Sequence, residues 1–376
     1  MRKLRIMTIV GTRPEIIKLS EFIKVADKNF EHILVHTGQN YDYELNQVFF
    51  EDLGLREPNY YLGVVGNNLG ETMGNVLSKS YELMTEVKPD ALVVLGDTNS
   101  CLCVISAKRL KIPIFHLEAG NRCFDENLPE EVNRRIVDTV SDVNLCYSEH
   151  ARRNLLAMDF PTDRVFVIGS PMREVLSVNR LTIEQSDVLA REGLQEGRYI
   201  LLSAHREENI DNEKNFKEMT SAINALAEEY DMPVLYSMHP RSKKFIEQRG
   251  TQFHPLVKAH KPFGFHDYIR LQMGAYCVVS DSGTLAEESA ILGFPAVSLR
   301  TSTERPEVVD KGAFILGCIS SEQLVQSVAL EVELRGKEES VPDYAGSYIS
   351  SKVAKIIQGY SGYVNRAVWK KPIRII

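Results

Sequence analysis

The sequence predicts an α/β protein with two doubly wound domains, each built on a parallel sheet. Short β-branched runs recur along the 376 residues, and charged segments of helical periodicity lie between them, which is the pattern of repeated βαβ units. The runs are apolar throughout instead of alternating with polar residues, as strands covered on both faces require. Because these runs are many for one sheet and the chain is long enough for two cores, we expect two domains.

The apolar runs mark the expected strands in chain order. In the first half they are residues 4–11, 32–38, 91–97, 112–120, 143–148 and 165–170. In the second half they are residues 199–205, 234–240, 277–283 and 296–300. The segments between them are long enough for the crossover helices that parallel strands need.

A polar interval at residues 169–199 separates the two groups of strands. Because linkers between domains are polar and exposed, we expect the boundary near residue 170. The expected domains are therefore 1–170 and 171–360, both Rossmann-like. The remaining residues, 361–376, form a tail whose docking site the sequence leaves open.

Composition excludes several classes of protein. With 44% hydrophobic and 25% charged residues the chain is an ordinary globular one, and its net charge of -7 offers no basic field to nucleic acid or an anionic membrane. We interpret the start, MRKLRIMTIVG, as the first strand rather than a signal peptide, and no run nears the roughly 20 apolar residues that cross a bilayer. Six cysteines without a paired CxxC indicate reduced thiols. A cytoplasmic protein that binds neither nucleic acid nor membrane is expected.

Polar side chains follow the expected strands at their carboxyl ends. In an open parallel sheet this edge is where ligands bind. The residues placed there are Arg13, Lys18, Asp97, Glu118, His205 and Ser282. Each of them is a candidate for binding or chemistry.

The segment SDSGTLAEESAILG, residues 280–293, indicates an anion site. A tight Ser-Gly turn leads into a helix, whose first N–H groups and dipole attract negative charge, and Ser282 adds a hydroxyl donor. The alternative is an ordinary helix cap, because Ser and Thr cap helices without any ligand. Glu288 follows in the helix, within reach of a ribose diol if phosphates occupy the turn. Together the two features favour a nucleotide.

The segment GTRPEIIK, residues 11–18, is the matching element of the first half. Arg13 is suited to bidentate phosphate contact, and Pro14 opens a helix that carries Lys18. A solvated helix start is the alternative. Since the sequence has no GxGxxG, it does not support a dinucleotide cofactor.

Acidic residues gather at the ends of neighbouring strands. Asp97 follows a buried run, where an unpaired carboxylate is costly unless it caps the next helix or takes part in chemistry. Glu118 ends the next strand in HLEAGNRCFDENLPEEVNRR. Further along that segment, Glu130 and Arg134 share one face of a helix, with a surface ion pair as the alternative for them. Three acids gather here beside arginines, and this favours a role in proton transfer. Where the surroundings raise the pKa of one carboxyl and lower that of another, the first can act as an acid and the second as a base.

His205 and Tyr268 are single-residue candidates. His205, in SAHREEN, can donate or accept a proton near neutral pH, although a structural histidine is the commoner role. Tyr268 is one of three aromatic residues in KPFGFHDYIRLQ, with Phe263 and Phe265, any of which could face a flat base, although core packing accounts for most aromatic residues. No HExxH motif or paired CxxC provides a zinc site, so no metal is expected.

Taken together, the motifs GTRPEIIK, GDT, HLEAG, PEEVNR, HREEN, SDSG and TERPE, which span residues 11–307, resemble the non-hydrolysing UDP-N-acetylglucosamine 2-epimerase family. The resemblance implies a glycosyltransferase-B-like arrangement of two Rossmann-like domains, with the active site in the cleft between them. It also implies a homodimer, a UDP-2-acetamido-sugar substrate and inversion at sugar carbon 2 without a nicotinamide or other cofactor. In this family UDP is eliminated to give a 2-acetamidoglycal and is then added back, with the proton delivered to the other face.

The resemblance assigns roles to the residues that match its motifs. The substrate-binding residues that it implies are Arg13 and Lys18 for phosphate or sugar, Ser282, Gly283 and Thr284 for the diphosphate, Glu288 for the ribose, and Tyr268 for the uracil face, with Arg305 of TERPE nearby. The catalytic residues that it implies are the carboxylates Asp97, Glu118 and Glu130, with Arg134 and His205 supporting the departing UDP and the proton transfer. A base on one face and an acid on the other require several carboxylates. Fixed cationic and backbone donors stabilise the charge that develops on a leaving diphosphate.

Three departures from the usual family pattern stand out. The usual SGG is SGT here, which places Thr284 at a glycine position. NYDYELNQ at residues 40–47 replaces a His-Arg pair, so the sequence does not support the effector UDP-sugar site of some bacterial members. The loop NRCFDENLPEE is shorter than usual.

The segments EIIKLS, GDTNSCL and EAGNRCFDEN resemble the subgroup that acts on 6-deoxy-L-sugars. This resemblance predicts epimerisation of UDP-2-acetamido-2,6-dideoxy-L-talose to UDP-N-acetyl-L-fucosamine for a bacterial capsule or O-antigen polysaccharide. The alternative reaction is the interconversion of UDP-GlcNAc and UDP-ManNAc. Two other functional classes on the same fold are a glycosyltransferase and a regulator that binds a nucleotide sugar. An experiment has to distinguish them from an epimerase.

Overall fold

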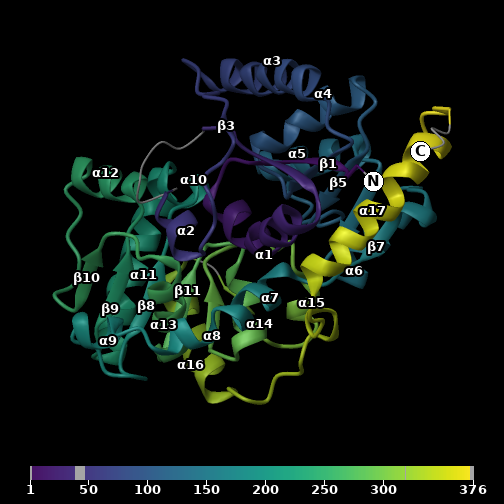
Figure 1. Ribbon diagram of the computed structural model, residues 1–376. Coiled ribbons are helices and arrows are strands. Elements are labelled where there is room, and N and C mark those ends of the chain that lie inside the picture. The colour runs from purple at the N-terminus through teal and green to yellow at the C-terminus, as the bar shows by residue number, and fades with distance from the viewer. Residues whose placement is uncertain (1, 39–46, 318, 373–376) are drawn as a thin grey trace. The chain divides into compact units, whose positions relative to one another are not determined.

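The computed structural model describes residues 2–38, 47–317 and 319–372 and divides into two compact units (Figure 1). The first unit comprises Met1–Ser177 and Pro342–Ile376, and the second comprises Val178–Val341. Each unit is built on one parallel sheet with helices along it, so the predicted α/β class with two Rossmann-like domains is confirmed.

The sheet of the first unit has seven strands in the order β3-β2-β1-β4-β5-β6-β7. Their bounds are β1 Arg5–Val10, β2 Glu31–His36, β3 Tyr60–Tyr61, β4 Ala91–Leu95, β5 Ile114–Leu117, β6 Val143–Cys146 and β7 Val165–Val167. All neighbouring strands are parallel, and all residues of β4, β5 and β6 are buried. The fully buried strands explain why these runs are apolar throughout.

Helices of the first unit lie along both faces of that sheet. Their bounds are α1 Arg13–Asn29, α2 Gln47–Asp52, α3 Leu69–Val87, α4 Val104–Arg109, α5 Pro129–Val140, α6 Glu149–Ala157, α7 Pro171–Val178 and α17 Ile349–Ala367, with 3-10 turns at Asn99–Cys103, Thr162–Arg164 and Pro342–Tyr344. Helices α3, α4 and α5 share one core with the middle strands. Proline opens α1 and α5 as the sequence predicts, because its fixed φ and missing N–H suit a first turn.

The sheet of the second unit has six strands in the order β10-β9-β8-β11-β12-β13. Their bounds are β8 Ile200–Ser203, β9 Val234–Ser237, β10 Val257–His260, β11 Cys277–Ser280, β12 Ala296–Ser298 and β13 Ile315–Leu316. The helices are α8 Arg180–Glu184, α9 Val188–Arg191, α10 Glu207–Ile210, α11 Glu213–Tyr230, α12 Pro240–Gln248, α13 Phe265–Gly274, α14 Leu285–Leu292, α15 Pro306–Val309 and α16 Ser321–Glu333. All neighbouring strands are again parallel.

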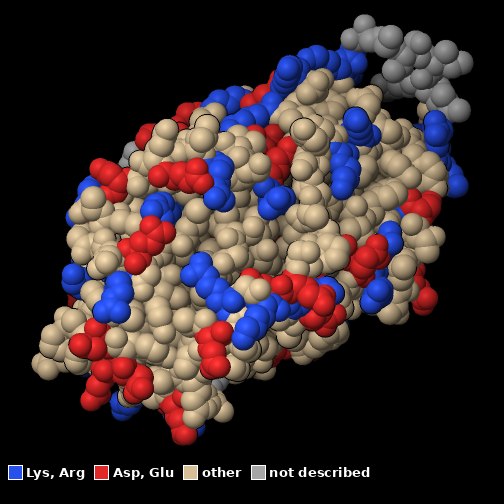
Figure 2. Space-filling view, turned by 90° about the horizontal axis from the view of Figure 1, so that it is seen from below, with Lys and Arg blue, Asp and Glu red and all other residues tan. Residues whose placement is uncertain are grey.

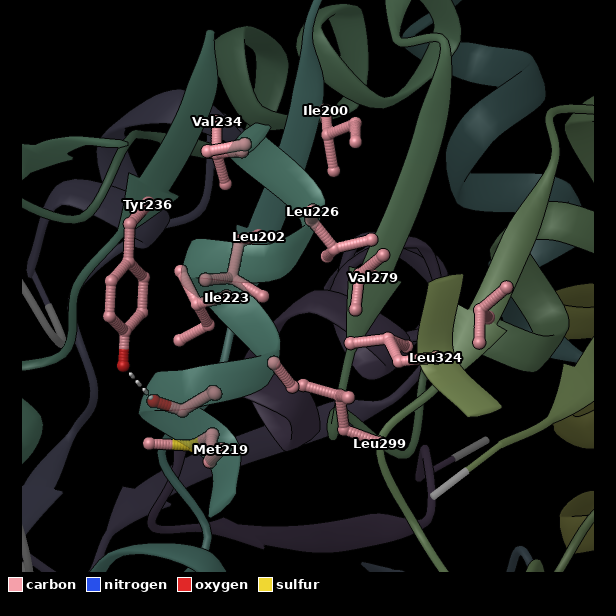
Figure 3. Packing of buried hydrophobic residues seen from close by; sticks show 14 of the residues in the cluster. Ile200, Leu202, Met219, Ile223, Leu226, Val234, Tyr236, Val279, Leu299 and Leu324 are labelled. Atoms are coloured by element: carbon pink, nitrogen blue, oxygen red, sulfur yellow. Dashed lines mark hydrogen bonds between the residues drawn. The ribbon is translucent and has the colours of Figure 1, made fainter. Parts of the chain in front are cut away.

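The core of the second unit lies between this sheet and helices α11 and α16. Figure 3 shows Ile223 and Leu226 of α11 and Leu324 of α16 facing strand residues such as Val279, with all four almost completely buried. The Tyr236 hydroxyl donates to the Ala204 carbonyl at 2.8 Å, along the dashed line in Figure 3. A satisfied hydroxyl lets a large aromatic ring fill the core without an unpaired polar atom.

The last helix, α17, belongs to the first unit, which differs from the predicted range of 171–360 for the second domain. Ser350 donates from its N–H and its hydroxyl to the Glu174 carboxylate, each at 2.7 Å. Lys352 donates to the Ile168 carbonyl at 2.7 Å, and α17 packs along α1. Residues 361–367 of the predicted tail continue this helix, so α17 is the docked element that the sequence left open.

Strands β3, β10 and β13 are additional to the predicted ones. Each lies at the edge of its sheet, and two of them have only two residues. β10 reads VKAH and is largely exposed, because an edge strand needs no continuous apolar face. Continuous apolar runs in the sequence therefore predict the interior strands of both sheets but do not predict these three edge strands.

Charges of both signs are interspersed on the face of the molecule in Figure 2. Within the described part of the chain, no helix combines the length and the apolar character that spanning a membrane requires. The described cysteines, Cys101, Cys103, Cys123, Cys146 and Cys277, are buried and form no disulfide, and Cys318 lies outside the described residues.

Candidate active site

Asp97 follows strand β4 and is held by an arginine from α5. Gly96 turns the chain with a φ of 81°, and the Asp97 side chain emerges half-buried. Its Oδ2 atom accepts from Nε of Arg134 at 2.8 Å and lies 2.7 Å from Nη2. Because only 3% of the Arg134 side chain is exposed, salt screens this pair far less than a surface pair. The structure thus brings these two predicted residues together.

Glu118 follows the neighbouring strand β5 and pairs with Lys18 of α1. Nζ of Lys18 donates to Oε2 of Glu118 at 2.7 Å, and 4% and 9% of the two side chains are exposed. Glu118 has a φ of 69°, which is uncommon for a residue with a side chain and persists only where the surrounding structure enforces it. Leu95 and Leu117 are register partners, so Asp97 and Glu118 leave the same edge of the sheet on neighbouring strands.

Glu131, rather than Glu130, is the acid of α5 that pairs with Arg134. Nη1 of Arg134 donates to Oε2 of Glu131 at 2.9 Å, so one guanidinium bridges Glu131 and Asp97. Glu131 is fully buried, whereas Glu130 is half-buried and makes no hydrogen bond or ion pair with the described residues. The alternative of a Glu130–Arg134 surface pair is therefore wrong, because Arg134 turns inward. Glu130 stays a predicted catalytic residue.

Glu15 is a buried acid to which the sequence analysis assigned no role. Its Oε2 accepts from the N–H groups of Gly11 and Thr12, each at 2.7 Å, and its Oε1 accepts from the Thr98 hydroxyl at 2.8 Å. It therefore ties the loop after β1 to the loop after β4. Burial raises the pKa of the Glu15 carboxyl, and these donors oppose protonation. The spacing of Thr12 and Glu15 is that of a capping box, which is the signal that reveals such a residue.

A buried charge network supports the loop after β5. The Asp138 carboxylate accepts from the N–H of Gly120 at 3.2 Å and lies 2.7 Å from Nη1 of Arg122 and 3.0 Å from Nδ1 of His116. Gly120 has a φ of 81°, and a Cβ there would come within 2.3 Å of the Ala151 carbonyl oxygen. Only glycine fits this turn, which fixes the course of the chain just after Glu118.

Arg13 lies in the first turn of α1 and is half-buried, with its guanidinium carbon 5.5 Å from the centroid of the Phe49 ring. Residues 39–46, which hold most of the segment NYDYELNQ, lie outside the described residues. The prediction about an effector site in that segment therefore stays a prediction.

Ser282, Gly283 and Thr284 form the turn between β11 and α14, as predicted. The Ser282 hydroxyl oxygen lies 3.1 Å from that of Thr284 and accepts from the Thr284 N–H at 3.4 Å. A Cβ at Gly283 would come within 2.8 Å of Oε1 of Glu304, so a side chain there would have to displace the Glu304 carboxylate. Thr284, at the usual glycine position, is the N-cap residue of α14.

Asp281 holds the loop that carries His205. Its Oδ2 accepts from the N–H groups of His205 and Arg206 at 2.8 and 2.9 Å, and Nδ1 of His205 lies 3.2 Å from Oδ1. Burial alone would raise the pKa of the Asp281 carboxyl, but the His205 ring and these donors outweigh it and lower the pKa to about 2. His205 stacks on His239 with ring centroids 5.5 Å apart. Asp281 lies within SDSG, yet nothing in the sequence distinguishes it from a helix cap.

Glu288 bonds to Gln272, which lies on the same helix as Tyr268. Glu288 lies on α14 and is buried, and its Oε2 accepts from Nε2 of Gln272 at 2.6 Å. Gln272 is one turn beyond Tyr268 on α13, and Tyr268 is half-buried. The residues predicted for ribose and uracil therefore come from two helices that contact each other.

Arg305 is buried and pairs with Glu287. Its Nε and Nη2 lie 3.1 and 2.7 Å from Oε1 of Glu287, with 1% and 0% of the side chains exposed. Arg305 thus connects the start of α15 to α14. Its predicted place beside the substrate stays a prediction.

The predicted residues form two groups, one in each unit. The first unit holds carboxylates in direct contact with buried cations, an arrangement that can accept and return a proton. The second holds a Ser-Gly-Thr turn at a helix start, an arrangement that can bind a diphosphate. The cleft between domains stays a prediction. Among the described residues, no three His, Cys, Asp or Glu side chains are placed to hold a metal ion.

Comparisons with known proteins point to one family. Residues 24–358 match the family described as UDP-N-acetylglucosamine 2-epimerase. A solved structure of that name from Rickettsia bellii is 44% identical, with a TM-score of 0.90 over 98% of this chain and 100% of that one. The Methanocaldococcus jannaschii UDP-GlcNAc 2-epimerase, solved with UDP-GlcNAc and UDP, is 33% identical, with a TM-score of 0.90 over 95% and 100%. The UDP-2,3-diacetamido-2,3-dideoxy-D-glucuronate 2-epimerase of Pseudomonas aeruginosa is 31% identical over 94% of this chain and 99% of that protein.

Proposed function

Because the chain belongs to the UDP-N-acetylglucosamine 2-epimerase family, we propose that it converts UDP-2-acetamido-2,6-dideoxy-L-talose to UDP-N-acetyl-L-fucosamine for a surface polysaccharide. The protein is a UDP-sugar 2-epimerase, and the identity of the sugar is the proposal. Support comes from contacts among the three segments that resemble the 6-deoxy-L-sugar subgroup. EIIKLS meets EAGNRCFDEN through Lys18 and Glu118 at 2.7 Å, and Glu15, which opens EIIKLS, meets GDTNSCL through Thr98 at 2.8 Å.

In the proposed reaction a carboxylate takes the proton from carbon 2 while the bond from carbon 1 to the diphosphate oxygen breaks. UDP leaves, and a double bond forms between carbons 1 and 2 to give the 2-acetamidoglycal. UDP then adds back to carbon 1, and an acid returns a proton to the opposite face of carbon 2. Because base and acid act on opposite faces, the reaction needs at least two proton-transferring groups, and we assign both roles to carboxylates.

Asp97 and Glu118 suit these two roles because their surroundings differ. Asp97 is 18% exposed and faces the delocalised Arg134 guanidinium, which Glu131 shares. Glu118 is more deeply buried and faces the compact ammonium of Lys18. A guanidinium stays charged throughout, whereas an ammonium can give up a proton when it is desolvated. Glu130 is the third candidate, and the roles of all three are proposals.

The UDP part of the substrate is assigned to the second unit. Ser282 and the first N–H groups of α14 would hold the diphosphate, Glu288 would accept from the ribose hydroxyls, and Tyr268 would cover the uracil. His205, positioned by Asp281, would support the leaving oxygen. Fixed donors stabilise the charge as it develops, which is the main requirement for breaking the bond from carbon 1 to oxygen.

UDP-GlcNAc and UDP-ManNAc form the second candidate pair of substrates. The R. bellii and M. jannaschii structures both carry the UDP-N-acetylglucosamine 2-epimerase or UDP-GlcNAc 2-epimerase name, and the M. jannaschii protein was solved with UDP-GlcNAc. The P. aeruginosa relative is named for a sugar with a second acetamido group and a carboxylate. Substituents at carbons 3 and 6 therefore vary among proteins similar to this chain, and family membership leaves the sugar open.

Incubation with each UDP-sugar in heavy water tests the proposal. We expect deuterium at carbon 2 of the recovered UDP-sugar and conversion of the 6-deoxy-L-talose substrate, with UDP-GlcNAc turned over at least tenfold more slowly. Equal or faster turnover of UDP-GlcNAc would replace the proposed substrate with the second candidate. Release of free hexosamine would indicate a hydrolysing enzyme, and absence of exchange with every 2-acetamido sugar would indicate a transferase or a regulator.

A homodimer formed through helices α3, α4 and α5 of the first unit is part of the proposal. These helices share one core, and they expose apolar side chains, with 60% of Leu69, 44% of Tyr81 and 45% of Val132 accessible. Exposed apolar groups on neighbouring helices are typical of a surface that a second copy covers. Analytical ultracentrifugation should find a dimer for the wild-type chain and a monomer for Tyr81→Glu. A monomeric wild-type protein would rule this interface out.

A further inference from the structure

Phe124 is an exposed aromatic residue in a strained backbone conformation, in the loop between Glu118 and helix α5. It leaves 72% of its surface accessible, and its φ is 59°, in the left-handed region that favours glycine. Neither property helps the fold, because water disfavours an exposed ring and a side chain disfavours this φ. Residues kept in such conformations cluster at binding and active sites.

The neighbours of Phe124 impose this conformation. On one side, the N–H of Cys123 donates to Oε2 of the buried Glu131 at 3.1 Å. On the other side, Asp125 accepts from the N–H of Asn127 at 3.1 Å and from its side-chain amide at 2.8 Å. Hydrogen bonds therefore hold the chain on both sides of Phe124.

The anchor of this loop is also a partner of the catalytic group. Oε2 of Glu131 accepts from the N–H of Cys123 and also from Nη1 of Arg134. Nε of Arg134 in turn donates to the Asp97 carboxylate. One carboxylate and one guanidinium thus link the loop to the carboxylate proposed to act at carbon 2. The loop also begins a few residues after Glu118, the partner of Lys18. The backbone directly before Phe124 is therefore linked to Asp97 through two buried side chains.

A phenyl ring beside a sugar discriminates between a methyl and a hydroxymethyl group. A methyl group gains from contact with the ring, whereas a hydroxymethyl group loses a hydrogen bond to water unless it finds a partner there. We propose that Phe124 is a specificity-determining residue that contacts carbon 6 of the substrate and favours 6-deoxy sugars. This inference rests on the proposed reaction and extends it to the residue that selects the substrate.

The test compares kcat/KM for pairs of UDP-sugars that differ only at carbon 6. One pair is UDP-GlcNAc and its 6-deoxy derivative, and the other is the proposed L-talose substrate and its 6-hydroxy counterpart. Phe124→Ala should lower kcat/KM for the 6-deoxy member about tenfold and change the 6-hydroxy member less than twofold, since one apolar contact discriminates by roughly that factor. Phe124→Leu should keep part of the preference.

Two further variants separate this role from a role in folding. Phe124→Gly removes the strain, so it should raise Tm while losing the 6-deoxy preference. Tyr348→Ala is the matched control, because Tyr348 is 75% exposed and has a φ of 63° but belongs to the start of α17. It should leave the preference unchanged.

The proposal is overturned if Phe124→Ala lowers kcat/KM equally for both members of each pair or for neither. A wild-type enzyme that acts only on the D-sugars would refute the proposed L-talose substrate. The role of Phe124 would then still be decided by the UDP-GlcNAc pair, so the two failures can be told apart.

Discussion

The acids of the candidate site have different partners in the two units. In the first unit, Asp97 and Glu118 pair directly with cationic side chains at 2.7 Å. In the second unit, Asp281 mainly binds backbone N–H groups at 2.8 and 2.9 Å. We propose that the carboxylates of the first unit exchange the substrate proton, whereas the Asp281 carboxylate holds the shape of a loop. Glu15 of the first unit also binds backbone N–H groups, so the difference concerns the candidate residues and not every buried acid.

The largest effect is expected from neutralising the first group. Asp97→Asn and Glu118→Gln keep size and hydrogen-bonding atoms but remove a base or an acid, so turnover should fall about a thousandfold. Deuterium incorporation at carbon 2 measures this loss, and UDP binding should stay within about twofold of the wild type. If both variants turn over at the wild-type rate, the assignment of these carboxylates is wrong.

Asp281→Asn should produce a smaller effect of a different kind. Its folded-state pKa of about 2 lies below the ordinary 3.8, so the ionised carboxyl stabilises the fold by about 2 kcal/mol above pH 4. That contribution is lost as the pH falls from 3.8 towards 2. Urea titrations between pH 2 and 7 should show this loss in the wild type and a flatter profile, at lower stability, in the variant. Identical profiles would mean that Asp281 does not hold the loop.

Gly283→Ala should give the smallest effect and one confined to the second unit. The added Cβ would meet Oε1 of Glu304, which is buried and pairs with Arg300 at 2.8 Å, so overpacking should cost about 1 kcal/mol. Calorimetry should also show severalfold weaker UDP binding. Gly359→Ala in α17 is the control, because a Cβ there meets nothing within 4 Å and should stabilise the helix slightly. Equal behaviour of the two variants would contradict a tight turn at Gly283.

The sequence predicts the interior of both sheets because strands such as β4, with all residues buried, must be apolar throughout. It misses β3 and β13 because two-residue edge strands carry too few side chains for a pattern. It also cannot show that α17 returns to the first unit. The amphipathic pattern of α17 indicates that one face of the helix is covered. The part of the protein that covers it is known only from the contacts of α17 with Glu174 and Ile168 in the structure.

The candidate residues are predictable where a motif marks a strand end, as at Asp97, Glu118 and Ser282. The residues that position them are harder to find. Glu15 and Glu131 look like ordinary first-turn acids of α1 and α5, and only their depth shows that one joins two loops and the other supports Arg134. Sequence patterns report secondary structure and local caps, whereas these roles depend on partners brought near by the fold.

Calorimetric titration of UDP into Asp97→Asn and Ser282→Ala, side by side with the wild type, tests the division of roles most directly. Asp97→Asn should bind UDP within about twofold of the wild type, whereas Ser282→Ala should bind it about tenfold more weakly, because it loses a hydrogen bond to a charged phosphate. Wild-type affinity in Ser282→Ala together with lost affinity in Asp97→Asn would contradict the account.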